Sequence, residues 1–272
     1  MADFYSGKIA LVTGGASGIG RALGKELCRR GAHAILADID IERAKMCTDE
    51  IGKAGGSVEA MHLDVSDAGQ VRKAIEETVA RHGRIDYLFN NAGIAILGDA
   101  RDITLEQWKR VVDVDLWGVV HGIDAAYPVM VKQGFGHIVN TASMAGLIPI
   151  PAILSYTASK HAVVGLSLAL RQEARDLGVN VSVVCPGFVR TEIFDNAETT
   201  NINRDGLNEK VPIAANVDRT ARRILRGVKR NRAVITPTLD GRPFWRLYRA
   251  APWLFGPILH NMVGDMRELR DE

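Results

Sequence analysis

Short runs rich in β-branched residues alternate with longer amphipathic stretches along most of this chain, and this alternation limits the possible folds more than any other feature. Strands that are separated by a helix usually lie parallel in one sheet, with the helices packed on its faces. Because such crossovers are right-handed, a series of them winds into an open sheet with helices on both sides. The sequence therefore predicts an α/β fold with a doubly wound, Rossmann-type parallel sheet.

Seven of these runs fit one sheet, with six helical patterns between them. The expected strands cover residues 9–12, 34–37, 58–63, 87–89, 137–140, 181–184 and 233–235. The expected helices cover residues 18–30, 41–54, 68–82, 105–132, 155–177 and 217–230. The length suits one large domain, which we assign to residues 1–240.

Two regions break the alternation. Residues 190–215 are polar, show little periodicity and follow an expected strand, so we expect a substrate lid there. Residues 241–272 mix aromatic residues with arginines, and Pro252 and Pro257 interrupt any long helix. We expect this C-terminal extension to pack on the domain or on a neighbouring subunit; a lid over the pocket and a peripheral membrane contact are the alternatives.

Composition and charge exclude several classes of protein. The formal net charge is only +2, which argues against a nucleic-acid partner. The cysteines, at positions 28, 47 and 185, fit neither a zinc nor a thioredoxin-like pattern. The first residues do not read as a signal peptide, and no apolar run reaches bilayer-spanning length. We expect a soluble, cytoplasmic protein without a metal ion.

A glycine-rich segment lies where the first strand hands over to the first helix. Glycine permits positive φ and close approach of a ligand, and a helix amino terminus offers unpaired N–H groups to an anion. An ordinary tight turn is the alternative. We predict a dinucleotide-binding loop, and its candidate residues are Gly14, Ser17, Gly18, Ile19 and Gly20.

Asp38 ends the second expected strand, about 20 residues after the glycines, where a carboxylate accepts hydrogen bonds from a ribose. It would repel a 2′-phosphate, and neither Ala16, Ser17 nor the adjacent Ile39 supplies a cation, so NAD is favoured over NADP. In the alternative interpretation, Asp38 or Asp40 caps the next helix, and Asp40 is the better cap.

Tyr156 and Lys160 begin a long helical pattern, and their four-residue spacing puts them on one helix face. A neighbouring cation favours phenolate, so we expect the pKa of Tyr156 to be lowered towards a useful acid/base range. Ser143 follows the fifth expected strand and is placed to hold a substrate oxygen, although a serine in a loop is also often a simple hydrogen-bonding residue.

These features occur together and in one order with Asp64-Val65, residues 90–93, and Pro186-Gly187 followed by Thr191. In this combination the chain resembles the short-chain dehydrogenase/reductase family, in its compact single-domain branch, over about residues 6–237. The resemblance implies that Tyr156 is the general acid/base, that Ser143 orients the substrate oxygen, and that Lys160 lowers the Tyr156 pKa and binds the nicotinamide ribose. It further implies a cofactor site that includes Asp64, Val65, Asn91, Ala92, Gly93, Pro186, Gly187, Val189 and Thr191.

Asp115 departs from the family pattern, which usually has asparagine at the matching position of the helix after the fourth strand. In the family this residue helps to organise a proton path to the lysine. If the role uses the backbone carbonyl and a helix irregularity, aspartate can substitute for asparagine; if it needs the amide, turnover should suffer. A carboxylate here would also favour the cationic form of Lys160.

The segments expected beside the substrate are residues 94–97 and 147–153 with Phe188 and Phe194, and none of them is charged. We therefore expect an apolar secondary alcohol or ketone as substrate, oxidised or reduced by hydride transfer with NAD. An NADPH-dependent carbonyl reductase and a non-catalytic nucleotide-binding scaffold are the alternatives. Residues 162–170 are apolar on more than one helix face, which predicts a homodimer or homotetramer.

Overall fold

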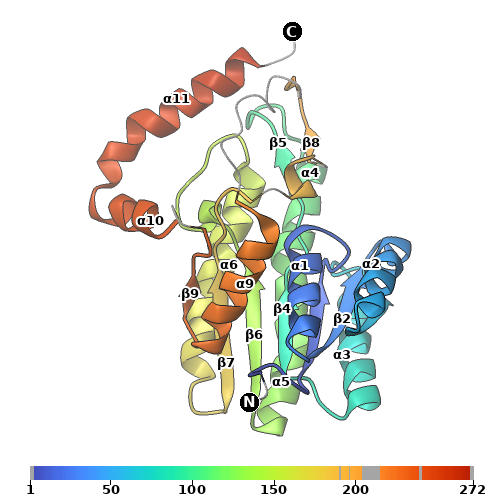
Figure 1. Ribbon diagram of the computed structural model, residues 1–272. Coiled ribbons are helices and arrows are strands. Elements are labelled where there is room, and N and C mark those ends of the chain that lie inside the picture. Colours follow the sequence, from blue (N-terminus) through green and yellow to red (C-terminus); the bar gives the residue numbers. More distant parts are fainter. Residues whose placement is uncertain (1–2, 190, 196, 204–214, 239–240, 270–272) are drawn as a thin grey trace.

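The computed structural model describes residues 3–189, 191–195, 197–203, 215–238 and 241–269. Its main feature is a seven-stranded parallel sheet of strand order β3-β2-β1-β4-β6-β7-β9 (Figure 1). The strands are β1 (Ile9–Thr13), β2 (His33–Asp38), β3 (Ser57–His62), β4 (Tyr87–Asn90), β6 (Gly136–Thr141), β7 (Val179–Val184) and β9 (Val234–Ile235). The predicted α/β fold with a doubly wound parallel sheet is confirmed.

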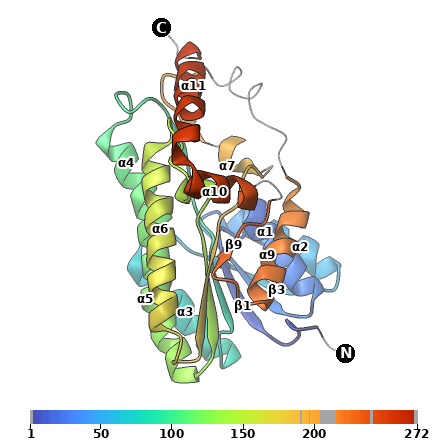
Figure 2. The same ribbon diagram turned by 90° about the vertical axis from the view of Figure 1, so that its left-hand side faces the viewer.

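Helices cover both faces of the sheet (Figure 2). On β2, Leu36 faces a core shared with one layer, whereas its neighbour Ile35 faces the core of the other, as the alternation along a strand requires. The first layer comprises α1 (Gly18–Arg29), α2 (Ile41–Lys53) and α9 (Val217–Lys229). The second comprises α3 (Ala68–His82), α5 (Gly118–Gln133) and α6 (Leu154–Glu173).

Local capping explains where several helices begin and end. The Asp40 carboxylate accepts a hydrogen bond from the Arg43 N–H at 3.0 Å, which caps α2. The Asp67 carboxylate caps α3 by accepting hydrogen bonds from the backbone N–H groups of Gly69 and Gln70. Gly83 ends that helix with a φ of +73°. Of the two aspartates considered as the cap of α2, Asp40 is therefore the one that caps it. The Asp38 carboxylate does not serve as the helix cap.

The helix predicted over residues 105–132 is interrupted, so that prediction was incomplete. It consists of α4 (Leu105–Val112), a π-helical turn over Asp113–Trp117, and α5. In the turn, the Gly118 N–H donates to the Asp113 carbonyl, five residues earlier. A one-residue insertion leaves little trace in an amphipathic pattern, but it changes the direction of the side chains within the turn.

A small second sheet lies beyond the carboxyl ends of the main strands. Strand β5 (Ile96–Leu97) pairs in parallel with β8 (Glu198–Thr199), and α7 (Glu192–Asp195) precedes β8. Two-residue strands are too short to show a periodicity, so the sequence did not indicate them. Part of the predicted lid at 190–215, namely residues 190, 196 and 204–214, lies outside the described residues.

The C-terminal extension contains α10 (Gly241–Ala250), a 3-10 turn and α11 (Phe255–Glu268). Phe255 is buried and contacts the rings of Phe244 and Tyr248, which joins the two helices. Helix α11 runs back over the end that carries β5 and β8 (Figure 1), where the Asn203 N–H donates to the Leu269 carbonyl at 2.7 Å. Among the described helices, we find none with the length and apolar composition that crossing a bilayer demands.

Candidate active site

A cavity of about 250 Å³ opens at the carboxyl ends of the central strands. This is the edge at which α/β sheets bind ligands. The cavity brings together most of the site residues predicted from the sequence, and these are Gly14, Ser17, Gly18, Ile19, Asn91, Ala92, Gly93, Ser143, Tyr156, Lys160, Pro186, Gly187, Val189 and Thr191.

The other predicted residues lie around the cavity without lining it. Ile39 is 64% exposed at the start of α2, and Val65 packs against the backbone of Gly118. The Asp64 carboxylate accepts hydrogen bonds from the amide and hydroxyl of Ser66. Gly20, Asp38 and Asp115 stand behind lining residues and act on them, as described below.

The glycine loop is shaped for an anionic ligand. Gly14 has a φ of +63°, and a Cβ atom on Gly20 would lie 2.0 Å from the Gly14 carbonyl oxygen. Ser17, the N-cap of α1, makes no side-chain capping bond within the described structure, and the first turn carries no acidic residue. The amides at this helix start therefore suit a phosphate group, so the loop fits the diphosphate of a dinucleotide.

Asp38 supports the same loop from β2. Its Oδ2 accepts a hydrogen bond from the Ala16 N–H at 3.0 Å, and its Oδ1 accepts from the Asp40 N–H at 3.1 Å. A carboxylate oxygen can accept more than one hydrogen bond, so capacity for a ribose hydroxyl remains. Arg43 was not among the residues predicted from the sequence; its guanidinium pairs with Glu192, a residue of the cavity wall.

Thr13 is a further positioning residue, and it was not among the site residues predicted from the sequence. Its hydroxyl oxygen accepts hydrogen bonds from the Asn91 N–H at 2.9 Å and the Ala92 N–H at 3.0 Å. The Asn91 side-chain amide returns a bond to the Thr13 carbonyl at 3.1 Å. These bonds join the ends of β1 and β4. The sequence offered one signal for this role, because Thr13 is a polar residue at the end of the otherwise apolar strand β1.

Tyr156 and Lys160 project from the first turns of α6 into the cavity, and both are buried. The Lys160 Nζ lies 5.3 Å from the Tyr156 ring centroid and donates to the Thr141 carbonyl at 3.2 Å. Ser143, which follows β6, lines the same cavity as Tyr156, and its hydroxyl oxygen accepts from the Ala145 N–H at 3.1 Å. The chain thus places a phenol, a hydroxyl and an ammonium group at one end of the cavity.

The pKa of Tyr156 lies above the ordinary phenol value, so the predicted lowering was wrong in direction. Burial raises this pKa most, and the Asp115 carboxylate raises it further. The Lys160 ammonium and the Ser143 hydroxyl lower it, but they offset only part of the effect of burial.

Asp115 lies directly behind Lys160. Its Oδ2 is 3.0 Å from the Lys160 Nζ, and its Oδ1 accepts a hydrogen bond from the Ile94 N–H at 2.8 Å. The π-helical turn presents this carboxylate to the lysine. Burial lowers the pKa of Lys160, but the Asp115 carboxylate, together with Tyr156 and Cys185, raises it by more, so the lysine remains a cation.

The segments expected beside the substrate are divided between different surroundings. Ile94 and Ala95 line the cavity, whereas Leu147 and Ile148 are packed in the core behind it. Phe188 is 40% exposed, and the side chain of Phe194 lies outside the described structure.

A second cavity, of about 170 Å³, lies between α11 and the neighbouring loops. Met266 on α11 lines it and packs against the apolar cluster that includes Tyr156. Arg267, also in its wall, donates to Asp99 at 3.1 Å. The extension therefore packs on the apolar cluster to which Tyr156 belongs.

Comparison with known proteins agrees with this geometry. The model of the short chain dehydrogenase family matches residues 8–202. The cyclohexanol dehydrogenase of an Acinetobacter species is 35% identical over 210 residues, which are 76% of this chain and 84% of the relative. The 2,5-dichloro-2,5-cyclohexadiene-1,4-diol dehydrogenase of Sphingobium indicum is 37% identical over 221 residues, 79% of this chain and 88% of the relative.

Among solved structures, a short chain dehydrogenase/reductase from Burkholderia phymatum in complex with NAD has a TM-score of 0.84. It is 31% identical, and the match covers 92% of this chain and 95% of that one. The fold and the cavity at the strand ends define a nicotinamide-dependent oxidoreductase of CH–OH groups. The chain belongs to the short-chain dehydrogenase/reductase family.

Proposed function

We propose that this protein is an NAD-dependent dehydrogenase of hydrophobic secondary alcohols, cyclic ones in particular, with Tyr156 as general acid/base. The observation that carries the proposal is the convergence of Tyr156, Ser143 and Lys160 in the cavity that begins at the glycine loop. Two relatives are named as dehydrogenases of a cyclic alcohol and a cyclic diol, which supports a ring-shaped substrate.

The preference for NAD over NADP depends on the Asp38 carboxylate and on whether the Arg43 guanidinium is paired with Glu192. The Asp38 carboxylate would repel a 2′-phosphate, and the nearest cation on α2, Arg43, is already paired with Glu192. A bound nicotinamide dinucleotide supplies the hydride acceptor or donor. The amides at the start of α1 hold its diphosphate in this proposal. Its nicotinamide half is bordered by residues 91–93 together with Pro186, Gly187, Val189 and Thr191.

In the oxidative direction, Tyr156 takes the carbinol proton while Ser143 holds the carbinol oxygen. The Lys160 cation stabilises the resulting phenolate and contacts the ribose hydroxyls. These groups position the reacting carbon and stabilise the charge that develops on its oxygen. Because burial raises the Tyr156 pKa, the cation beside it is needed for the phenol to act near neutral pH.

The substrate class follows from the charges along the cavity. Among its described lining residues, the charged ones are Lys160 and Glu192, and each has an ion-pair partner. A charged substrate would therefore lack a counter-ion in an apolar setting, at a cost of several kcal/mol. A neutral alcohol or ketone needs only the hydroxyl groups of Ser143 and Tyr156.

Arg43 favours a second candidate, an NADPH-dependent carbonyl reductase. If its guanidinium leaves Glu192 and turns towards the adenosine ribose, it would bind a 2′-phosphate and compensate for Asp38. The two candidates differ in cofactor and share the catalytic residues.

A panel of cyclic and linear secondary alcohols and ketones, each assayed with both cofactors at the reduced-nicotinamide absorbance, tests the proposal. We expect the highest kcat/KM for a cyclic alcohol with NAD. Tyr156→Phe should lower kcat at least ~10³-fold while NAD binding persists, and Tyr127→Phe, on α5, is the matched control. Turnover by Tyr156→Phe at the wild-type rate contradicts the assignment.

The assembly is also a proposal. Trp117, at the end of the π-helical turn before α5, is 50% exposed, and Leu154, at the start of α6, is 40% exposed. Exposed large apolar side chains on one layer favour burial against a second copy, so we propose a homodimer or homotetramer. Light scattering coupled to size-exclusion chromatography gives the mass directly.

A further inference from the structure

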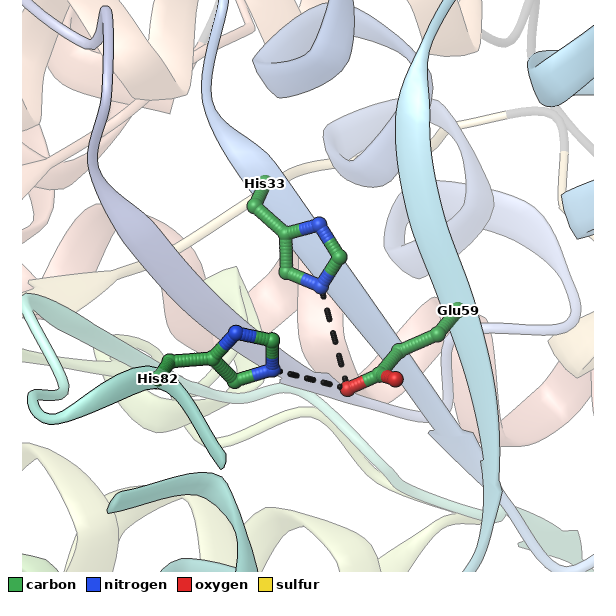
Figure 3. Close-up of side chains that lie close together, drawn as sticks. All are labelled: His33, Glu59 and His82. Atoms are coloured by element: carbon green, nitrogen blue, oxygen red, sulfur yellow. Dashed lines mark hydrogen bonds and ion pairs between the residues drawn. The ribbon is translucent and has the colours of Figure 1, made fainter. Parts of the chain in front are cut away.

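A cluster of two imidazoles and one carboxylate lies away from the cavity. His33 is the first residue of β2, Glu59 lies on the edge strand β3, and His82 ends α3 (Figure 3). Because the cavity is at the carboxyl ends of the strands, a group at the start of β2 belongs to the other end of the sheet. The proposed catalytic chemistry makes no use of these side chains.

The donor atoms of the three residues converge on one point. The Nε2 atoms of His33 and His82 lie 3.7 and 3.1 Å from the same oxygen, Oε1 of Glu59 (Figure 3). One ligand atom from each residue lies within 4.8 Å of the others. Two ligands of a tetrahedral zinc ion, each at about 2.1 Å from the metal, are separated by about 3.4 Å, so the observed spacing needs only small side-chain rotations.

The His33 ring is oriented as a metal ligand, whereas the His82 Nε2–H donates to Glu59 Oε1 at 3.1 Å and must give up this proton when a metal ion binds. The His33 Nδ1 is 2.7 Å from the Ser57 hydroxyl, and its buried Nε2 has no hydrogen-bond partner in the described part of the chain. With Nδ1 as donor to Ser57, Nε2 carries the lone pair, which is the usual arrangement of a metal-binding histidine.

Glu59 supplies the negative charge. Its Oε1 accepts a hydrogen bond from the His82 Nε2–H at 3.1 Å, as an ionised carboxylate does. Arg81 Nη1 lies 3.5 Å from the other oxygen, Oε2, which leaves Oε1 to face the imidazoles. The Arg81 charge is shared with Glu77, whose Oε2 accepts from Nη2 at 2.9 Å.

We propose that His33, Glu59 and His82 bind one Zn²⁺ ion, with water as the fourth ligand. Two imidazoles and a carboxylate form a donor set that zinc accepts in tetrahedral geometry. The ion would join β2, β3 and α3 at the edge of the sheet. Its role is to stabilise the fold, since ligand binding to the native state alone raises stability.

Zinc titration of the chelator-treated full chain, in competition with a chromophoric chelator, tests the site. We expect one zinc ion per chain with a Kd in the micromolar range or below. At a free zinc concentration of 100 Kd, the Tm should rise by about 5 °C. Co²⁺ should bind at the same site and give the visible absorption bands of a tetrahedral complex.

Variants separate the cluster from adventitious binding. Glu59→Gln and His82→Gln should each weaken zinc binding at least ~100-fold and abolish the rise in Tm. Ser57→Ala, which removes the partner of His33 Nδ1, should weaken it ~10-fold. His62→Gln, an exposed histidine on the same strand, is the matched control and should bind zinc as the wild type does.

Two results would overturn the proposal. One is the absence of zinc binding below 1 mM, which would reduce the cluster to a hydrogen-bonded imidazole–carboxylate contact. The other is an equal zinc affinity in Glu59→Gln, His82→Gln and His62→Gln, which would place the ion elsewhere. Far-UV circular dichroism and the Tm without zinc establish that each variant is folded, independently of catalytic activity.

Discussion

The Lys160 ammonium and the Asp115 carboxylate form a buried ion pair, 3.0 Å apart, one helical turn from the Tyr156 phenol. A buried pair is costly to desolvate, and losing one partner leaves the other charge uncompensated. Here the carboxylate also accepts the Ile94 N–H, so it joins α6, the π-helical turn and the loop after β4. Two of its effects oppose each other, since it holds Lys160 cationic and raises the pKa of Tyr156.

Asp115→Asn should preserve or raise kcat. The amide oxygen still accepts the Ile94 N–H, whereas the negative charge that raises the Tyr156 pKa is removed. A lower Tyr156 pKa makes the phenolate available at lower pH, so the acid limb of the kcat profile for alcohol oxidation should shift to lower pH. Asp113→Asn, in the same π-helical turn, is the control; a thousandfold loss of kcat in Asp115→Asn would show that the acid is needed.

Asp38→Asn should relax the cofactor preference. The amide oxygen keeps the hydrogen bond from the Ala16 N–H, while the charge that repels a 2′-phosphate is lost. We expect the ratio of kcat/KM for NADP to that for NAD to rise about 10- to 100-fold, equivalent to about 1.4–2.8 kcal/mol. Asp40→Asn retains a good helix cap and should leave the ratio unchanged; a wild-type preference for NADP would refute the role of Asp38.

His137 should make stability depend on pH. Burial, with a smaller effect of Arg171, lowers the pKa of this imidazole to about 3, and its Nε2 contacts the Ser182 hydroxyl at 2.9 Å. The unfolded chain binds the proton near pH 6.5 and the folded chain does not, so stability is present above pH 6.5 and is lost as the pH falls towards 3.

Urea unfolding of wild type and His137→Gln at several values between pH 4.5 and 7.5 measures this contribution. The slope of the unfolding free energy against pH should be smaller in the variant by up to about 1.4 kcal/mol per pH unit. This is the slope that corresponds to the binding of one proton on unfolding. His260→Gln, at an exposed position of α11, should have the wild-type slope. Parallel slopes for wild type and His137→Gln would contradict the neutral buried state.

Met266→Ser should weaken binding of apolar substrates. The side chain packs from α11 against the cluster that contains Tyr156 and lines the second cavity. We expect KM for a cyclic alcohol to rise about 10-fold with a smaller change in kcat and an unchanged Kd for NAD. Ile258→Ser, an exposed site earlier on α11, serves as control, and an unchanged KM in Met266→Ser would remove the extension from the substrate site.

The sequence by itself determined the sheet, its covering helices and most residues of the cavity wall. These features depend on local rules: the alternation along β2, the Asp40 cap, the positive φ of Gly14, and the spacing of Tyr156 and Lys160 on one helix. Each rule operates within a few residues, so the chain displays it directly.

Only the tertiary structure decided the features that depend on contacts between residues far apart along the chain. The π-helical turn that presents Asp115 to Lys160, the burial that reverses the expected direction of the Tyr156 pKa, and the meeting of His33, Glu59 and His82 all join segments far apart along the chain. The packing of α11 on the apolar cluster that contains Tyr156 is of the same kind. Desolvation and ion pairing depend on every group that surrounds an atom, and those neighbours are assembled only when the sheet and its helix layers pack together.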